Sequence, residues 1–266
     1  MDGAIDLLPL VSTGFGVGFM IGLTGVAGAA LMTPLLISVF GVPAPVAIGT
    51  DLLYASITKM AAVWRHHVAG HIVWRLVLFL ALGSIPVSLG VIAVLAQTGL
   101  DEKALAHTLR VALAVMLPIS ALAIVLRPFF MRQCAVEDGE ARFSKGRLAV
   151  VVLLGALLGF AVTLTSVGAG AIGVPVLALL FPALAAKRIV GTDIAHAAAL
   201  ALVAGLGHLG LGQVDFKLLG ALLVGSIPGI IIGSALCDRA PDWLLRPVLG
   251  VTLCYAAYLM VTTPLN

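Results

Sequence analysis

Eight apolar runs, each long enough to cross a membrane as a helix, cover most of the 266-residue chain. They lie at 7–40, 44–67, 72–97, 104–127, 148–182, 188–210, 215–236 and 242–263. Only 10% of the residues are charged, against about 25% in a typical soluble domain. Apolar runs of this length are typical of membrane helices, in which every backbone amide finds a partner within the segment. The sequence therefore predicts an all-α polytopic membrane protein.

The two halves of the chain repeat each other. "GFMIGLTGVAGAALMTPLL" at 18–36 aligns with "GFAVTLTSVGAGAIGVPVL" at 159–177, an offset of 141 residues. At an offset of 142, the tripeptide "GTD" at 49–51 aligns with the same tripeptide at 191–193, and "GSIP" at 83–86 aligns with "GSIP" at 225–228. Matched segments in one order indicate an internal duplication. We expect a first repeat at 1–127, a linker at 128–147 and a second repeat at 148–266.

The first run of each half is too long for one upright span. As a single helix, 7–40 would reach about 50 Å, against a hydrocarbon core of about 30 Å. Small residues interrupt both runs, in "TGVAGAA" and "TSVGAGA". Two arrangements fit: one strongly tilted helix, or a re-entrant hairpin of two half-helices at 7–40 and at 148–182. With the hairpins, each half would add three transmembrane helices, at 44–67, 72–97 and 104–127 and at 188–210, 215–236 and 242–263.

The distribution of Lys and Arg favours the hairpins. With hairpins the two repeats are inverted, and a cytoplasmic linker then puts most basic residues, Arg65 and Arg127 among them, at cytoplasmic ends. Single spans would move a group of basic residues outside: Lys187, Arg188, Arg239 and Arg246. We therefore expect two inverted repeats in a bacterial inner membrane, with both termini outside.

The interrupted segments are the first candidate site. A half-helix that begins inside the membrane turns its positive dipole end, with free backbone N–H groups, toward the cavity that it lines. Paired Gly-interrupted segments at matched positions are typical of transporter binding sites. Close helix packing is the structural alternative for small residues. The candidate substrate-binding residues here are Thr24, Gly25, Gly28, Thr165, Ser166, Gly168 and Gly170.

Each GTD tripeptide puts a carboxylate at membrane depth. Asp51 and Asp193 are costly to bury, so a functional role is the starting hypothesis. Two roles remain open from the sequence. The carboxylates, helped by Thr50 and Thr192, could brace the loosened hairpin backbone, or they could also couple transport to protons or ions.

Two further polar residues lie on the helices that carry the GTD tripeptides. Lys59 follows Asp51 by two turns and has Ala201 as its counterpart. It could bind an anionic substrate, pair with Asp51, or extend to the cytoplasmic edge. His196 lies one turn after Asp193, where it could relay protons or pack as a hydrogen-bonded histidine.

Signatures of an enzyme, a metal site or a cofactor site are missing from the sequence. It has no HExxH, Ser-His-Asp order or phosphate-binding loop, and its three cysteines are too widely spaced to form a metal site or a disulfide framework. We expect no enzyme activity, no metal and no cofactor.

The duplicated "GFMIGLTGVAGAALMTPLL" and "GFAVTLTSVGAGAIGVPVL" segments, the GTD that follows each, and the matched "GSIP" resemble the TauE/SafE family of membrane permeases, the sulfite-exporter type. The resemblance covers nearly the whole chain. It implies an all-helical inverted repeat that moves sulfite or organosulfonates such as sulfoacetate, usually outward.

The sequence and the resemblance together predict a secondary transporter of small sulfur-containing anions that works by alternating access. A passive anion channel is the alternative, and a cation or metal transporter ranks below it. The expected partners are the lipid bilayer, the small anion and, through the two aspartates, protons. A homodimer with a second copy of the chain stays open, and no nucleic acid is expected.

Overall fold

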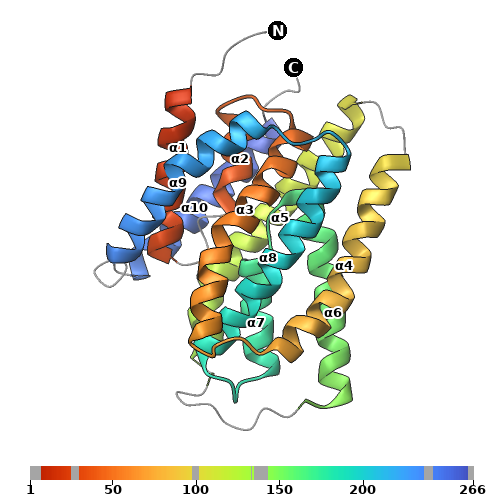
Figure 1. The fold of residues 1–266 in the computed structure, drawn as a ribbon, viewed down its shortest axis with the longest axis vertical. Coiled ribbons are helices and arrows are strands. Elements are labelled where there is room, and N and C mark those ends of the chain that lie inside the picture. The colour runs from red at the N-terminus through yellow and green to blue at the C-terminus, as the bar shows by residue number, and fades with distance from the viewer. Residues whose placement is uncertain are drawn as a thin grey trace.

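The computed structural model describes residues 7–24, 30–97, 102–132, 134, 143–236 and 242–262. Within these ranges the chain forms ten helices and no strands (Figure 1). The first half contains α1 (Leu7–Thr24), α2 (Met32–Ser38), α3 (Ala44–Val68), α4 (Trp74–Gln97) and α5 (Glu102–Met131). The second half contains α6 (Lys145–Thr165), α7 (Ala169–Leu180), α8 (Ala186–Gly210), α9 (Phe216–Leu236) and α10 (Asp242–Thr262).

The chain is an integral membrane protein. Among the described residues, six helices are long and apolar enough to cross a bilayer: α3, α4, α5, α6, α8 and α9. Their outward faces carry large exposed apolar side chains, such as Leu153 and Val224, both about two-thirds exposed. A soluble protein does not leave so many apolar side chains in water, whereas lipid solvates them.

Helix boundaries follow local sequence signals. Pro43 precedes α3 and Pro45 lies in its first turn. Proline is tolerated there because the first backbone N–H groups of a helix have no hydrogen-bond partner within it. The Ser144 side chain accepts a hydrogen bond from the Arg147 amide and begins α6. Asp215 Oδ1 accepts bonds from the amides of Lys217 and Leu218 and begins α9.

Helices extend into both ends of the polar stretch at 128–147. Helix α5 continues through Pro118 and Pro128 to Met131, and α6 already begins at Lys145. A proline removes one amide and bends a helix, but within the membrane neighbouring helices hold the segment in place. Helix α5 therefore ends one turn beyond the apolar run at 104–127.

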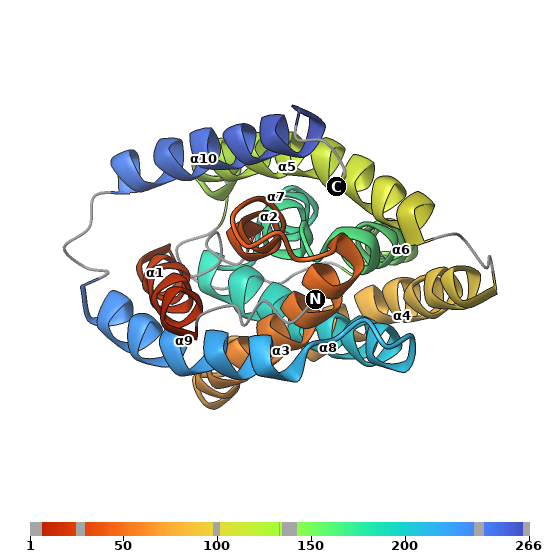
Figure 2. The same ribbon diagram turned by 90° about the horizontal axis from the view of Figure 1, so that it is seen from above.

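Helices of one half pack against helices of the other in matching pairs. Helix α1 lies along α9, and α6 lies along α4. Helices α3 and α8 pack together at the centre, and α5 packs along α10. Figure 2 shows α2 and α7 between the α5–α10 pair on one side and the row of α9, α3, α8 and α4 on the other. The shortest helices thus occupy the interior.

Small residues let the paired helices approach closely. An added Cβ on the α1 glycines would collide with the α9 backbone, and one on the α9 glycines would collide with the α1 backbone. The residues concerned are spaced by four along each helix: Gly14, Gly18 and Gly22 on α1, and Gly225, Gly229 and Gly233 on α9. Glycines at this spacing permit backbone contact between membrane helices. The α4–α6 pair does the same through Gly83, Gly155 and Gly159.

Candidate functional site

The glycine and threonine of each GTD tripeptide hold the turn of the opposite half. An added Cβ at Gly49 would collide with the carbonyl oxygen of Gln213, in the α8–α9 turn. The Thr50 hydroxyl accepts a hydrogen bond of 3.0 Å from the Asp215 amide in the same turn. Thus the first tripeptide needs glycine for close approach and threonine to satisfy a turn amide.

The second tripeptide makes the equivalent contacts in the other direction. A Cβ at Gly191 would lie 2.9 Å from the carbonyl oxygen of His71, in the α3–α4 turn. The Thr192 hydroxyl accepts a bond of 2.9 Å from the Val73 amide and donates to the Arg188 carbonyl. We call these two sets of contacts the reciprocal clasp. Thr50 and Thr192 therefore join the halves, a role that differs from supporting their own hairpins.

The two aspartates are equally buried but differ in their partners. Both have zero exposure. The Thr33 hydroxyl, on α2, donates a hydrogen bond to Asp51 Oδ2, and Ser166 is a second polar neighbour. Asp193 Oδ1 instead occupies the space that a Cβ at Gly173 on α7 would take. Neither oxygen of Asp193 has a hydrogen-bond partner among the residues that the structure describes.

The break between α6 and α7 is built from three consecutive signals. The Thr165 hydroxyl donates to the Ala161 carbonyl and accepts from the Val167 amide, so it closes the end of α6. Ser166 takes the left-handed conformation with φ 59°, and Gly168 has φ 118°, which only glycine adopts without strain. Helix α7 then begins at Ala169.

The corresponding break in the first half is described less fully. Thr24 is the last residue of α1, and its side chain is not described. Gly25 and Gly28 lie outside the described residues.

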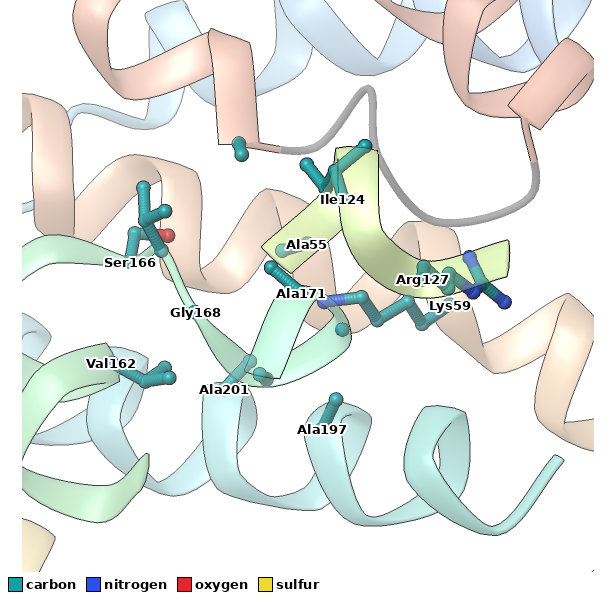
Figure 3. A pocket seen from close by; sticks show the side chains of 14 residues that line it. Ala55, Lys59, Ile124, Arg127, Val162, Ser166, Gly168, Ala171, Ala197 and Ala201 are labelled. Atoms are coloured by element: carbon teal, nitrogen blue, oxygen red, sulfur yellow. The ribbon is translucent and has the colours of Figure 1, made fainter. Parts of the chain in front are cut away.

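A small pocket lies at the start of α7 (Figure 3). Its volume is about 30 Å³, room for a water or two. Lys59 from α3 and Arg127 from α5 form its basic side, and Ser166, Gly168 and Gly170 form the side at the α6–α7 break. In Figure 3 the Lys59 side chain extends across the pocket toward Ala171, in the first turn of α7, with Arg127 beside it.

A larger cavity continues from this pocket. Its volume is about 310 Å³, and it shares Lys59, Arg127 and Gly170 with the small pocket. Asp193 from α8 and the end of α3, with Arg65 and His66, complete its polar wall. Arg65 and His66 also line a third pocket of about 330 Å³, together with His71. Each pocket shares lining residues with the next, from the α7 N-terminus to the end of α3, and we call this series of pockets the basic path.

The matched histidines of the two halves have different surroundings. His208 Nδ1 is 2.7 Å from Gln213 Oε1, and its Nε2 is 2.9 Å from the Thr163 carbonyl oxygen. Its counterpart His66 faces His71, with ring centroids 5.6 Å apart. Buried Nδ1 of His66 has no hydrogen-bond partner within the described ranges. His66 and His71 thus line the basic path, whereas both ring nitrogens of His208 have hydrogen-bond partners.

The structure brings only part of the expected substrate site together. Lys59, Ser166, Gly168 and Gly170 line the small pocket, whereas the Thr165 hydroxyl bonds to the Ala161 carbonyl and the Val167 amide at the end of α6. His196 lines none of the three described pockets, and its Nε2 is 2.9 Å from the Ser84 hydroxyl on α4.

Arg127, Arg65 and His66 line the larger cavity, and none of them is among the substrate-binding residues expected from the sequence. Arg127 lies one turn before the end of α5 at Met131, and the apolar run at 104–127 gave no signal for this continuation.

This arrangement can hold an anion. Two long basic side chains meet the first turn of α7, where unpaired backbone amides carry partial positive charge. Charged donors of this kind form short, strong hydrogen bonds to oxyanions. The path from the pocket is lined with further basic and imidazole groups, which attract anions and repel cations.

Membrane-length helices packed around a buried basic cavity define a membrane transport protein. The chain belongs to the family described as "Sulfite exporter TauE/SafE", which matches residues 10–260. It is 40% identical to the probable membrane transporter protein YjnA of Bacillus subtilis over 230 residues, which cover 86% of this chain and 90% of that protein. It is 29% identical to a probable membrane transporter protein of Xylella fastidiosa over 261 residues, 96% of this chain and 95% of that one. No solved structure was found to match the chain.

Proposed function

We propose that the protein is a secondary transporter of small sulfur-containing anions, sulfite or organosulfonates such as sulfoacetate, and that it exports them by alternating access. The observation that carries the proposal is the buried pocket in which Lys59 and Arg127 meet the N-terminus of α7. The family description, which names a sulfite exporter, supports the choice of sulfur oxyanions.

The binding mode follows from the donors around the pocket. Because the small pocket holds only a water or two, the anion would extend from these donors into the larger cavity, which shares Lys59, Arg127 and Gly170 with it. One anionic oxygen would face the Lys59 ammonium, and another would face the Arg127 guanidinium. Backbone amides at the start of α7, near Gly168 and Gly170, would donate to the remaining oxygens. The Ser166 hydroxyl lines the same pocket and has no hydrogen-bond partner in the described part of the chain. A sulfite or sulfonate group offers three oxygens to such converging donors.

We infer that the two halves form an inverted repeat. The reciprocal clasp and the matched packing of α1 on α9 and α6 on α4 support this arrangement. In Figure 1, α1 begins near one end of the bundle and α6 begins at the opposite end, as an inverted repeat requires. Rocking of one half against the other would then move the site between the two sides of the membrane.

The basic path gives the side to which the site is open. It runs to the end of α3, the end of the bundle at which α5 finishes and α6 begins. We propose that this end faces the cytoplasm of a bacterial cell, because basic residues gather there, and that both termini lie outside. The cavity is then ready to receive an anion from the cytoplasm.

The test is transport by the purified full-length protein in proteoliposomes. Exchange of ³⁵S-labelled sulfite and sulfoacetate across the bilayer would be measured over a range of concentrations, with chloride and sulfate as competitors. We expect saturable exchange of at least one sulfur anion. A flux that rises linearly with concentration would instead indicate the passive channel, and no flux of either anion would refute the substrate class.

A matched pair of variants tests the site. Lys59→Met removes the ammonium group and keeps the aliphatic chain. Loss of a charged hydrogen bond costs about 1.5–3 kcal/mol, so binding should weaken about 10-fold to 150-fold. Lys103→Met removes an exposed charge at the far end of α5 and should leave exchange unchanged. Equal effects of the two variants would show that Lys59 does not contact the anion.

A further inference from the structure

We propose that Asp193 is a proton-binding site that couples proton movement to anion movement, and that Asp51 is a structural brace. The proposal rests on the proposed function above, because it assigns a second ligand to the same cavity. It starts from the different surroundings of two residues that occupy equivalent positions in the two halves.

The difference between the aspartates originates in one aligned position. Thr33 on α2 aligns with Val174 on α7, at the offset of 141 residues. Thr33 donates a hydrogen bond to Asp51, and this bond ties α3 to the hairpin. The valine side chain has no donor, and the residue before it, Gly173, has no side chain where Asp193 Oδ1 lies. Asp193 therefore keeps a carboxylate without hydrogen bonds to the described residues.

Asp193 also lines the cavity that leads to the anion pocket, whereas Asp51 lines none of the three described pockets. The charged and titratable groups that share the larger cavity with Asp193 are Lys59, Arg65 and His66 from α3 and Arg127 from α5. Helices α1, α7 and α9 contribute only uncharged side chains to this wall. On its own helix His196 lies one turn further on, but it turns to Ser84 on α4.

These neighbours give Asp193 two states, one ionised and one protonated. With an empty pocket, the carboxylate balances part of the charge of Lys59 and Arg127. When an anion binds to those two groups, it replaces the carboxylate as their counter-charge. A buried carboxylate that loses its counter-charge is costly, and a proton removes that cost. Anion and proton therefore bind favourably together, and each raises the affinity for the other by the same factor.

The consequence is movement of proton and anion in the same direction, with the direction set by the two gradients. A divalent anion with one proton would carry one net negative charge, and a monovalent anion with one proton would carry none.

Proteoliposomes with an entrapped pH dye test the coupling. The probe is sulfoacetate at pH 7.5, at which both its acidic groups are ionised, so that any proton that moves is carried by the protein. Wild-type protein with an outward sulfoacetate gradient should make the interior more alkaline as anion leaves. Exchange of labelled sulfoacetate, which needs no net proton movement, is measured in the same vesicles and reports whether the protein transports at all.

Three variants separate the roles. In Asp193→Asn the ratio of the dye signal to the exchange rate should be at least tenfold lower than in wild type. Asp51→Asn should keep that ratio within about twofold of wild type, because an asparagine oxygen still accepts the bond from Thr33. Val174→Thr, which is close to isosteric, introduces a donor at the position equivalent to Thr33. It should also lower the ratio, because the new hydroxyl can donate a hydrogen bond to the Asp193 carboxylate.

A label makes the test independent of whether Asp193→Asn folds. A hydrophobic carbodiimide reacts with protonated carboxyl groups in apolar surroundings, and mass spectrometry locates the adduct. We expect an adduct on Asp193 of wild-type protein, with less at high pH, and none on Asp51.

Exchange without a dye signal in wild-type protein would overturn the coupling and leave the transporter in place. Equal loss in the two asparagine variants, an adduct on Asp51 alone, or exchange that requires sodium at constant pH would overturn the assignment of Asp193. No exchange by wild-type protein would refute the proposed function itself.

Discussion

The contact between α1 and α9 can be tested by adding a single methyl group. A Cβ at Gly14 would lie 2.6 Å from the carbonyl oxygen of Leu222 and 3.1 Å from its Cα. Ordinary contacts begin at 3.4 Å, so Gly14→Ala must push the helices apart locally by about 0.8 Å. Overpacking of this kind costs about 1–3 kcal/mol. The partner atoms are backbone, which cannot move aside as a side chain can.

Gly16 provides the matched control on the same helix. No described atom beyond its own helical neighbourhood lies within 4 Å of a Cβ at this position, which faces outward. Both alanine variants gain the same helix propensity, about 1 kcal/mol. The difference between them therefore isolates the collision, and we expect Gly14→Ala to be less stable than Gly16→Ala by about 1–3 kcal/mol.

The assay is reversible unfolding of the purified protein in mixed micelles, titrated with a denaturing detergent and followed by tryptophan fluorescence. The free energy of unfolding is compared between the two variants in one detergent mixture. A difference below about 0.5 kcal/mol would refute the close backbone contact between α1 and α9.

Three further predictions concern the turns and the linker. Thr50→Ala and Thr192→Ala each remove one bond to a turn amide and should each lower the free energy of unfolding by about 1–2 kcal/mol, with similar values because the bonds are equivalent; a loss in only one of them would contradict the clasp. Gly70 has φ 68° in the α3–α4 turn, so Gly70→Ala should lower the melting temperature at a cost of about 1–2 kcal/mol, and an unchanged melting temperature would argue against this turn. Partial burial raises the pKa of the Cys134 thiol, and the thiolate is the reactive form. In a protein with its other cysteines changed to serine, a membrane-impermeant maleimide should therefore react slowly at pH 7 and about tenfold faster for each pH unit above it, until the thiol is ionised. Reaction from the cytoplasmic side alone would support the proposed orientation, and reaction from outside would refute it.

Much of the helical architecture could be predicted from sequence because membrane helices leave a strong compositional signal. Uninterrupted apolar runs coincide with α3, α4, α8 and α9. The interruption at 166–168 was visible as a cluster of small residues, and the structure separates α6 from α7 there. Ends of helices were harder, as α5 illustrates: it continues past the apolar run at 104–127 to Met131, because a helix does not stop where the apolar residues stop.

The partners of the GTD residues could not be predicted from sequence. Thr50 bonds to Asp215, 165 residues away, and no local pattern indicates so distant a contact. The duplication implies that the glycine and threonine of the two tripeptides make equivalent contacts, but it does not say that these contacts are with the opposite half. The alignment of Thr33 with Val174 was likewise visible, yet its meaning depends on the fold, which turns position 33 toward Asp51.

The reciprocal clasp limits how the two halves can diverge in evolution. Each half packs closely against a turn of the other half. A bulkier residue at Gly49 is therefore tolerated only if the backbone at Gln213 moves away, and the same holds for Gly191 and His71. Two copies that began alike are therefore bound to change in step at these positions. Chimaeras that join the first half of one family member to the second half of another should assemble only when each tripeptide is exchanged together with the turn that it holds.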